Sequence, residues 1–150
     1  MRIALAQINP TIGDLQGNTE IILRDIEKAK QNNADLVVFP ELAIPGYPPK
    51  DLLLREGFVE QCLTCAELIA SECQGIAAAV GLPTRSQTKP GTETKGGAQR
   101  CTFRGLHNSL AFCTEGKIAR LYHKRLLPTY DVFDEDRYFD PGNEVVVIEL

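Results

Sequence analysis

The sequence predicts an α/β protein built around a sheet with parallel neighbouring strands. Three apolar runs have the composition of buried strands: Ile3 to Ile8, Leu36 to Phe39 and Gly75 to Leu82. They alternate with two segments, 19–31 and 58–73, in which apolar residues recur at helical spacing. Strands and helices that alternate in this way are typical of parallel strands joined by right-handed crossovers. Nearly continuous apolar strands also indicate a sheet covered on both faces.

The first helix has both a start and a stop signal. Asn18 is the predicted N-cap, and Ile22, Ile26 and Ala29 follow at i, i+4 and i+7. The helix is expected to end at Asn32. In the second helix, cysteines join the apolar face.

The rest of the chain is more polar. Residues 84–104 contain almost no apolar side chains and predict an exposed, mobile loop. Two strands, 106–113 and 117–122, are expected to form a hairpin around a turn at 114–116. A last strand is predicted at 145–148.

Composition restricts the function. The 150 residues are 43% apolar and 24% charged, which is ordinary for a globular protein. The net charge of −4 argues against a general binder of nucleic acid or anionic membranes. No run is long enough to span a bilayer, and the amino terminus lacks the features of a signal peptide. We therefore expect a soluble cytoplasmic protein.

The cysteines are interpreted as core residues. Cys62 and Cys65 form a C-x-x-C sequence, with Cys73 further on, but no second ligand pair follows at zinc-finger spacing. An odd count of five without an export signal indicates reduced thiols. No metal site is predicted.

Glu41 is the first candidate for chemistry. It follows Phe39 and Pro40 at the carboxyl end of a predicted strand, where open α/β sheets bind ligands. Apolar neighbours would partly desolvate the carboxyl group and suit it to proton transfer near neutral pH. A surface or helix-capping glutamate is the alternative interpretation.

Lys124 is the second candidate, because it directly follows the hairpin. A lysine there can hold a developing oxyanion, orient a carboxylate, or act as a base when desolvated. Taken alone, a hydrated lysine at a strand end is the simpler interpretation. The charged run 134–137 is either a solvated network or, given the aromatic residues around it, a packed element at a pocket rim. Motifs of phosphate loops, dinucleotide-binding loops and serine-hydrolase elbows are absent from the sequence.

Three blocks of sequence together resemble the nitrilase superfamily of carbon-nitrogen hydrolases. The first is AQINPTIGDLQGN at 6–18, and the second joins FPEL at 39–42 to GYPPKDLL at 46–53. The third runs from Asn108 and Ser109 to Lys124 and on through YDVFDEDRYF at 130–139. GYPP and this last run are more particular to one branch, the amino-terminal glutaminase domain of glutamine-dependent NAD+ synthetases. The resemblance covers the chain except for residues 84–104.

The resemblance implies an α-β-β-α sandwich, of which residues 1–150 form the amino-terminal part. It implies that Glu41 is the general base and acid, and that Lys124 stabilises the oxyanion of the tetrahedral intermediate. Tyr130, Phe133 and Glu135 would line or support the glutamine pocket. Ammonia would then be consumed at a separate synthetase domain, where ATP and magnesium activate nicotinic acid adenine dinucleotide for conversion to NAD+. No cofactor is expected on these residues.

The nucleophile is where the sequence departs from this branch. Its cysteine follows a later strand, and none of the five cysteines here occupies that place. We therefore expect residues 1–150 alone to lack glutaminase activity. A stand-alone amidase or carbamoylase, and a non-catalytic binding or assembly fragment, are the alternatives. Half a sandwich would leave apolar surface uncovered, so a homo-oligomer or association with the rest of the polypeptide is expected.

Overall fold

The computed structural model describes residues 1–86, 92–95, 98–101, 105–131 and 133–149, with backbone only for 92–95 and 98–101. A five-stranded sheet has the order β1-β2-β3-β6-β7. Its strands are β1 (Ile3–Leu5), β2 (Leu36–Val38), β3 (Ala77–Arg85), β6 (Leu106–Thr114) and β7 (Lys117–His123). The first three run parallel, and β3, β6 and β7 are antiparallel neighbours.

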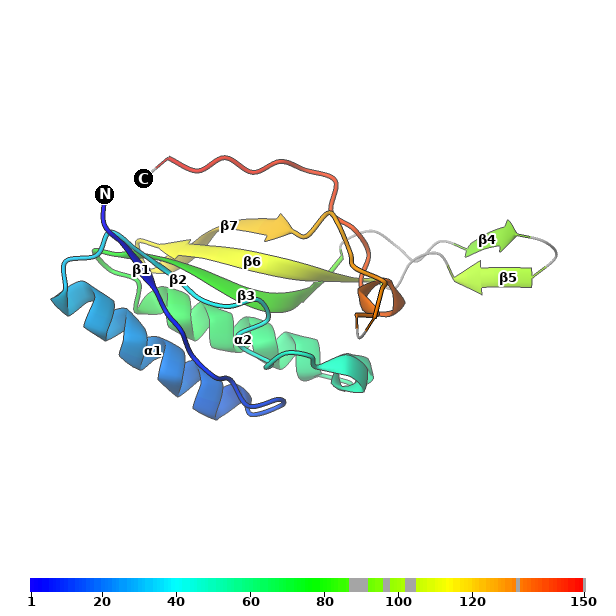
Figure 1. Cartoon of the computed structure of the whole chain (residues 1–150), viewed down its shortest axis with the longest axis horizontal. Helices are drawn as coiled ribbons and strands as arrows, with labels where there is room; N and C mark the ends of the chain where they lie inside the picture. The colour runs from blue at the N-terminus through cyan, green and yellow to red at the C-terminus, as the bar shows by residue number, and fades with distance from the viewer. Residues whose placement is uncertain (87–91, 96–97, 102–104, 132, 150) are drawn as a thin grey trace.

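Both α-helices lie on one face of this sheet. Figure 1 shows α1 (Leu15–Gln31) and α2 (Phe58–Ser71) side by side below the strands, whereas the C-terminal segment runs along the opposite side. Two short 3-10 helices, η1 (Lys50–Leu54) and η2 (Glu135–Arg137), lie in the connections. One helical layer on one sheet corresponds to half of the predicted α-β-β-α sandwich.

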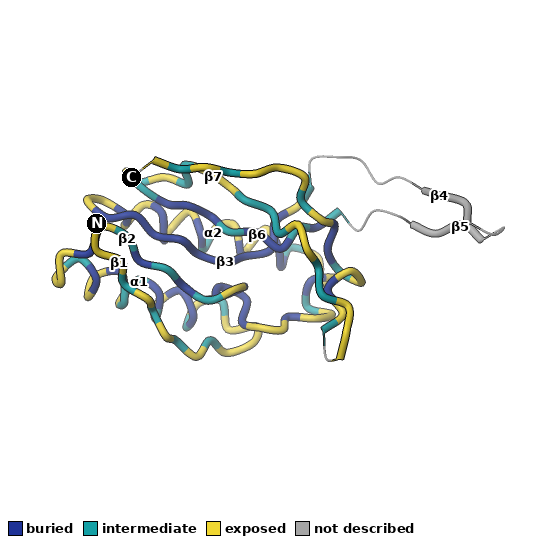
Figure 2. The backbone as a smooth tube through the Cα atoms, turned by 45° about the horizontal axis from the view of Figure 1, so that its top comes forward, coloured by how far each residue is buried: buried dark blue, intermediate teal, exposed yellow. Residues whose placement is uncertain are grey.

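The core lies between β3 and the two helices. Figure 2 shows β3 buried along nearly all of its length, and Val80 and Leu82 have no exposed surface. Ile22, Ile26 and Ile69 from the helices are at most 1% exposed. Burying each such side chain contributes about 1.5–3 kcal/mol. The helical spacing of these residues in the sequence is thus explained by a single buried face on each helix.

Cysteines belong to this core, as the sequence indicated. Cys62 and Cys73 have no exposed surface. Among the residues that the structure describes, no group of three or more His, Cys, Asp or Glu side chains could hold a metal ion. Nor is any described helix both long and apolar enough to cross a membrane.

The N-cap of α1 differs from the prediction. Asp14, not Asn18, precedes the helix, and its carboxylate accepts a hydrogen bond from the Gly17 N–H at 3.0 Å. Asn18 is 1% exposed and accepts from the Thr11 N–H, while its amide donates to the carbonyl oxygens of Thr11 and Ile44. Both residue types cap helices well, so only the tertiary contacts distinguished them.

The two ends of the described chain also differ from the prediction. The run 3–8 forms only a three-residue strand, and Leu5 is 76% exposed, because β1 lies at the edge of the sheet. Residues 145–148 form no strand, and Val145 and Val147 are 75% and 84% exposed. A strand requires a hydrogen-bonded neighbour, which this segment does not have among the described residues.

Part of the predicted loop 84–104 is regular structure. Thr84 and Arg85 still belong to β3, and β4 (Thr92–Lys95) pairs with β5 (Ala98–Cys101) in an antiparallel hairpin. Thr84 is buried, contrary to the predicted exposure, and the exposure of residues 87–104 lies outside what the structure describes. The hairpin of β6 and β7 is confirmed. Its two turn residues, Glu115 and Gly116, have φ values of 51° and 76°, as a two-residue hairpin turn requires.

Candidate active site

Glu41 lies in a turn, residues 39–46, that is bound to the middle of the sheet. The Phe39 N–H donates to the Ala79 carbonyl at 2.9 Å, and the Ile44 N–H donates to the Gly81 carbonyl at 3.2 Å. Leu42 and Ile44 are at most 1% exposed. This acid turn therefore follows β2 and is fixed to β3 at the carboxyl end of the parallel strands, where the sequence placed it.

Gly81 makes the close approach of the acid turn possible. A Cβ atom at this position would lie 2.3 Å from the Leu42 nitrogen and 2.9 Å from the Pro40 carbonyl oxygen. Both are backbone atoms and cannot rotate away. Because glycine has no Cβ, the turn packs directly on β3 and carries the Glu41 side chain with it.

Lys124 is held by its backbone from two sides. Its N–H donates to the Asn108 carbonyl at 2.8 Å, which extends the pairing of β6 and β7 by one residue. Its own carbonyl accepts from the Gly142 N–H at 2.9 Å. A Cβ at position 142 would lie 2.3 Å from the His123 carbonyl oxygen, so glycine is also needed here.

The two predicted catalytic side chains meet. Lys124 Nζ lies 2.7 Å from Glu41 Oε1, although 83 residues separate them in sequence. The same ammonium donates to Glu135 Oε1 at 3.0 Å and lies 2.9 Å from Glu135 Oε2. Glu135 is 5% exposed, whereas the Glu41 side chain is 44% exposed. One cation thus joins a buried carboxylate to an accessible one.

The electrostatics favour a charged lysine. Burial alone would lower the pKa of Lys124, but hydrogen bonds to Glu41 and Glu135 outweigh burial and raise that pKa above its usual value. At neutral pH the side chain is therefore an ammonium, which suits an oxyanion and not a general base. The sequence had left both roles open. It had also predicted a partly desolvated Glu41, and the Glu41 side chain is 44% exposed and so partly buried.

Asn108 completes the arrangement and was not predicted as a site residue. It is 3% exposed, and its Nδ2 donates to Glu41 Oε1. The signal lay in the sequence, because Asn108 begins a block that resembles the carbon-nitrogen hydrolases. Its contact with Glu41 depends on how β6 pairs with β3 and could not be read from spacing.

These residues line a cavity of about 260 Å³. Its walls are formed by Phe39, Pro40, Glu41, Gly81, Asn108, Ser109, Leu110, Tyr122 and Lys124. The cavity is open at one side and exposes the Glu41 carboxylate.

No cysteine is among the lining residues of this cavity. Cys62, Cys73 and Cys113 are fully buried elsewhere, and Cys65 is on α2. Burial raises the pKa of Cys62 to about 12, which leaves it a neutral thiol. Cys101 lies where the structure describes only the backbone. The described thiols are therefore not placed to react with a molecule held by Glu41 and Lys124.

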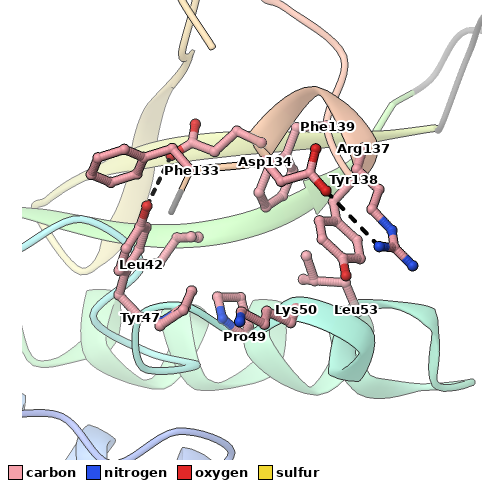
Figure 3. A pocket seen from close by; sticks show the side chains of 12 residues that line it. Leu42, Tyr47, Pro49, Lys50, Leu53, Phe133, Asp134, Arg137, Tyr138 and Phe139 are labelled. Carbon is pink, nitrogen blue, oxygen red and sulfur yellow. Dashed lines mark hydrogen bonds and ion pairs between the residues drawn. The ribbon is translucent and has the colours of Figure 1, made fainter. Parts of the chain in front are cut away.

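A second cavity, of about 150 Å³, lies on the other side of Glu135. Figure 3 shows Tyr47, Pro49 and Leu53 on one wall, facing Phe133 and Tyr138 from the C-terminal segment. Tyr47 Oη donates to Glu135 Oε1 at 3.4 Å. Burial and the charge of Glu135 raise the pKa of Tyr47, so it remains a donor at neutral pH.

The three residues predicted to line or support the glutamine pocket, Tyr130, Phe133 and Glu135, do not all lie at one cavity. Phe133 and Glu135 line this second cavity. Tyr130 does not line either cavity, is 69% exposed, and contacts Phe133 edge-on at 5.6 Å between ring centroids. Its role in binding stays a prediction.

Comparison with known proteins gives consistent matches. The carbon-nitrogen hydrolase family model matches residues 2–150. The glutamine-dependent NAD+ synthetase of Synechocystis sp. is 46% identical over 138 residues, covering 91% of this chain and 23% of the relative. The enzyme of the same name from Thermotoga maritima is 34% identical over 150 residues, which is all of this chain and 23% of the relative. The chain thus spans about a quarter of the length of these relatives.

Solved structures match in the same way. Glutamine-dependent NAD+ synthetase from Acinetobacter baumannii superposes with a TM-score of 0.83 at 33% identity, over 99% of this chain and 25% of that one. An amidase from Nesterenkonia sp. AN1 gives a TM-score of 0.70 at 26% identity, over 96% of this chain and 50% of that one. That structure is of a mutant of the amidase and shows the Michael addition of acrylamide at the active-site cysteine.

Proposed function

This chain belongs to the carbon-nitrogen hydrolase family, and we propose that it forms the acid-base and oxyanion-binding part of the glutaminase site in a glutamine-dependent NAD+ synthetase. The observation that carries the proposal is the contact of Lys124 Nζ with Glu41 Oε1 at 2.7 Å inside an open cavity. Such a pair serves a reaction that needs a carboxylate for proton transfer and a fixed cation for a developing negative charge.

The first half of the proposed reaction forms a thioester. The Glu41 carboxylate takes the proton of a cysteine thiol that is not among the residues lining the cavity. The thiolate attacks the side-chain amide carbon of glutamine, and the carbonyl electrons move onto oxygen. The Lys124 ammonium stabilises this oxyanion. Glu41 then gives its proton to the departing nitrogen, the C–N bond breaks, and ammonia leaves.

The second half hydrolyses the thioester. Glu41, again ionised, removes a proton from water, and the hydroxide attacks the thioester carbon. The second oxyanion forms at Lys124 and collapses, the C–S bond breaks, and glutamate leaves. The released thiolate takes back the proton that Glu41 removed from water, which returns both groups to their starting state. Glu135 supports both halves, because its buried carboxylate holds the ammonium in place and does not itself line the cavity. We propose that it is a positioning group and exchanges no proton.

The further chemistry is proposed for parts of the polypeptide beyond this site. Ammonia would amidate nicotinic acid adenine dinucleotide at a separate synthetase domain that uses ATP and magnesium, in a cytoplasmic homo-oligomer. A synthetase at 46% identity favours this over a stand-alone amidase, for which the matched structure is 26% identical. Glutamine is therefore the proposed substrate of the present site.

A chimera tests the proposal. Residues 1–150 replace the matching first quarter of the Synechocystis synthetase, and NAD+ formation is measured with glutamine and, separately, with ammonium. Glu41→Gln and Lys124→Met are each expected to reduce the glutamine-dependent rate by about 10³-fold or more. The ammonium-dependent rate should not change, because added ammonia bypasses the glutaminase site. Equal loss of both rates in Glu41→Gln, or full glutamine use by either variant, would contradict the assignment.

Residues 1–150 by themselves should not consume glutamine. Among the described residues, a carboxylate and a lysine line the cavity but no thiol does, so we expect no thioester to form there. The measurement is glutamate and ammonia release by the purified chain. Steady release that Glu41→Gln abolishes would show that the chain carries a complete glutaminase site.

A further inference from the structure

Asn108 connects the two halves of the site through separate groups. Its backbone carbonyl accepts from the Lys124 N–H at 2.8 Å, and its side-chain Nδ2 donates to Glu41 Oε1. The residue sits in β6 opposite Pro83 of β3 and is 3% exposed. A buried amide on the central part of a sheet has little freedom to move, so it can act as a fixed reference for both side chains.

The hydrogen bonds to Glu41 fall on one oxygen. Asn108 Nδ2 and Lys124 Nζ both donate to Oε1. Among the described residues, Oε2 of Glu41 accepts no hydrogen bond. Two donors on one oxygen fix the plane of a carboxylate, and this arrangement leaves the second oxygen without a donor among the described residues.

We propose that Asn108 is a positioning residue that, with Lys124, anchors Glu41 Oε1 so that Oε2 is the oxygen that exchanges the proton. The inference rests on the proposed function, since it assigns proton transfer to Glu41. In this role Asn108 acts through Glu41, to which its amide donates a hydrogen bond.

The chemistry of the amide explains why asparagine suits this position. An ionised carboxylate can only accept hydrogen bonds, so its buried neighbour has to be a donor. The Asn108 amide donates at every pH at which the protein is folded. An aspartate of nearly the same shape would instead face Glu41 with a second carboxyl group, and two such groups in contact share one proton.

Side-chain NMR on the whole 150-residue chain tests the anchor. The Glu41 carboxyl carbon is followed through a pH titration in the unsubstituted chain, in Asn108→Asp and in Asn108→Leu. Asn108→Asp should raise the midpoint of this signal by about one pH unit or more, and Asn108→Leu should raise it by less, because it removes a donor without adding a charge. If Asn108→Leu does not fold, Asn108→Asp alone decides the outcome.

Thr84→Val is the matched control. Thr84 is also buried and polar, but its hydroxyl bonds Ser109 and it does not line the Glu41 cavity. We expect Thr84→Val to alter stability while leaving the Glu41 midpoint unchanged. If the Asn108 variants also leave that midpoint unchanged, Asn108 is a structural residue only and the inference is wrong.

The chimera separates this inference from the proposed function. In Asn108→Asp, the acidic limb of kcat/KM for glutamine should move to higher pH by the same amount as the NMR midpoint, with the ammonium-dependent rate unchanged. An unsubstituted chimera without glutamine-dependent activity would refute the proposed function. The titration would still show whether Asn108 anchors Glu41. An active chimera whose pH profile does not move in Asn108→Asp would refute the inference alone.

Discussion

The acid and the lysine of the site are held by regions of opposite character. The acid turn, residues 39–46, is packed on β3, with Leu42, Ala43 and Ile44 at most 1% exposed. The segment that follows Lys124 is largely exposed until Glu135, with Leu126 at 86% and Tyr130 at 69%. Glu41 is therefore positioned by the core and Lys124 by polar contacts. The difference indicates that Glu41 contributes little to stability, whereas Lys124 stabilises the fold by neutralising a buried carboxylate.

Substituting Lys124 should have the largest effect and tests this contrast directly. Lys124→Met leaves Glu135 buried without its cation, and we expect a loss of about 3 kcal/mol in the free energy of unfolding. Glu41→Gln should cost less than about 1 kcal/mol, because an accessible ion pair contributes little. Urea unfolding at pH 7 measures both.

A second variant gives the control for this prediction. Adding Glu135→Gln to Lys124→Met removes the buried charge and should recover most of the lost stability. Equal losses of stability in Lys124→Met and Glu41→Gln would contradict this prediction. They would show that the buried Glu135 carboxylate depends on its cation no more than the accessible Glu41 carboxylate does.

Gly81→Ala should have the next largest effect, because it acts on the region that holds the acid. Its methyl group would meet backbone atoms of the acid turn, and relief requires that the turn moves off β3. We expect a loss of about 2 kcal/mol, together with weakened contact between Glu41 and Lys124. Gly17→Ala is the matched control, since the nearest atoms to a Cβ there belong to the Asp14 side chain, whose movement would disturb the N-cap hydrogen bond but no backbone packing. Similar losses in both variants by urea unfolding would argue against tight packing at Gly81.

Alkaline pH should have the smallest effect, and it tests the polar contacts that hold Lys124. The fold raises the pKa of Lys124 and of Tyr47 above their ordinary values of 10.5 and 10.0. Their contribution to stability is therefore complete below pH 10 and is lost as pH rises through the raised values. We expect a decrease of less than about 1 kcal/mol per group, since solvent partly screens both. Thermal unfolding from pH 8 to 11 should show a flatter profile in Tyr47→Phe.

The sequence predicted the parts of the fold that depend on local pattern. Apolar runs and helical spacing located β2, β3, α1, α2 and the β6–β7 hairpin, because each pattern matches a face that packs on the same core. Glu41 was found because the end of a buried strand can be recognised from Pro40. Predictions failed where the local structure depends on contacts with residues that are distant in the sequence. Both Asp14 and Asn18 are suitable caps, and residues 145–148 have strand composition without a partner strand among the described residues.

The sequence by itself determined which side chains are available for chemistry and which strand end carries the acid. Only the tertiary structure brought Lys124 onto Glu41, placed Glu135 behind it and aimed the Asn108 amide at the same carboxylate. The physical reason is that ionic and hydrogen-bond contacts act over about 3 Å, whereas the groups involved lie up to 94 residues apart in the chain. The pairing of β6 with β3 and the close packing allowed by Gly81 fix those distances, and neither can be read from a local pattern.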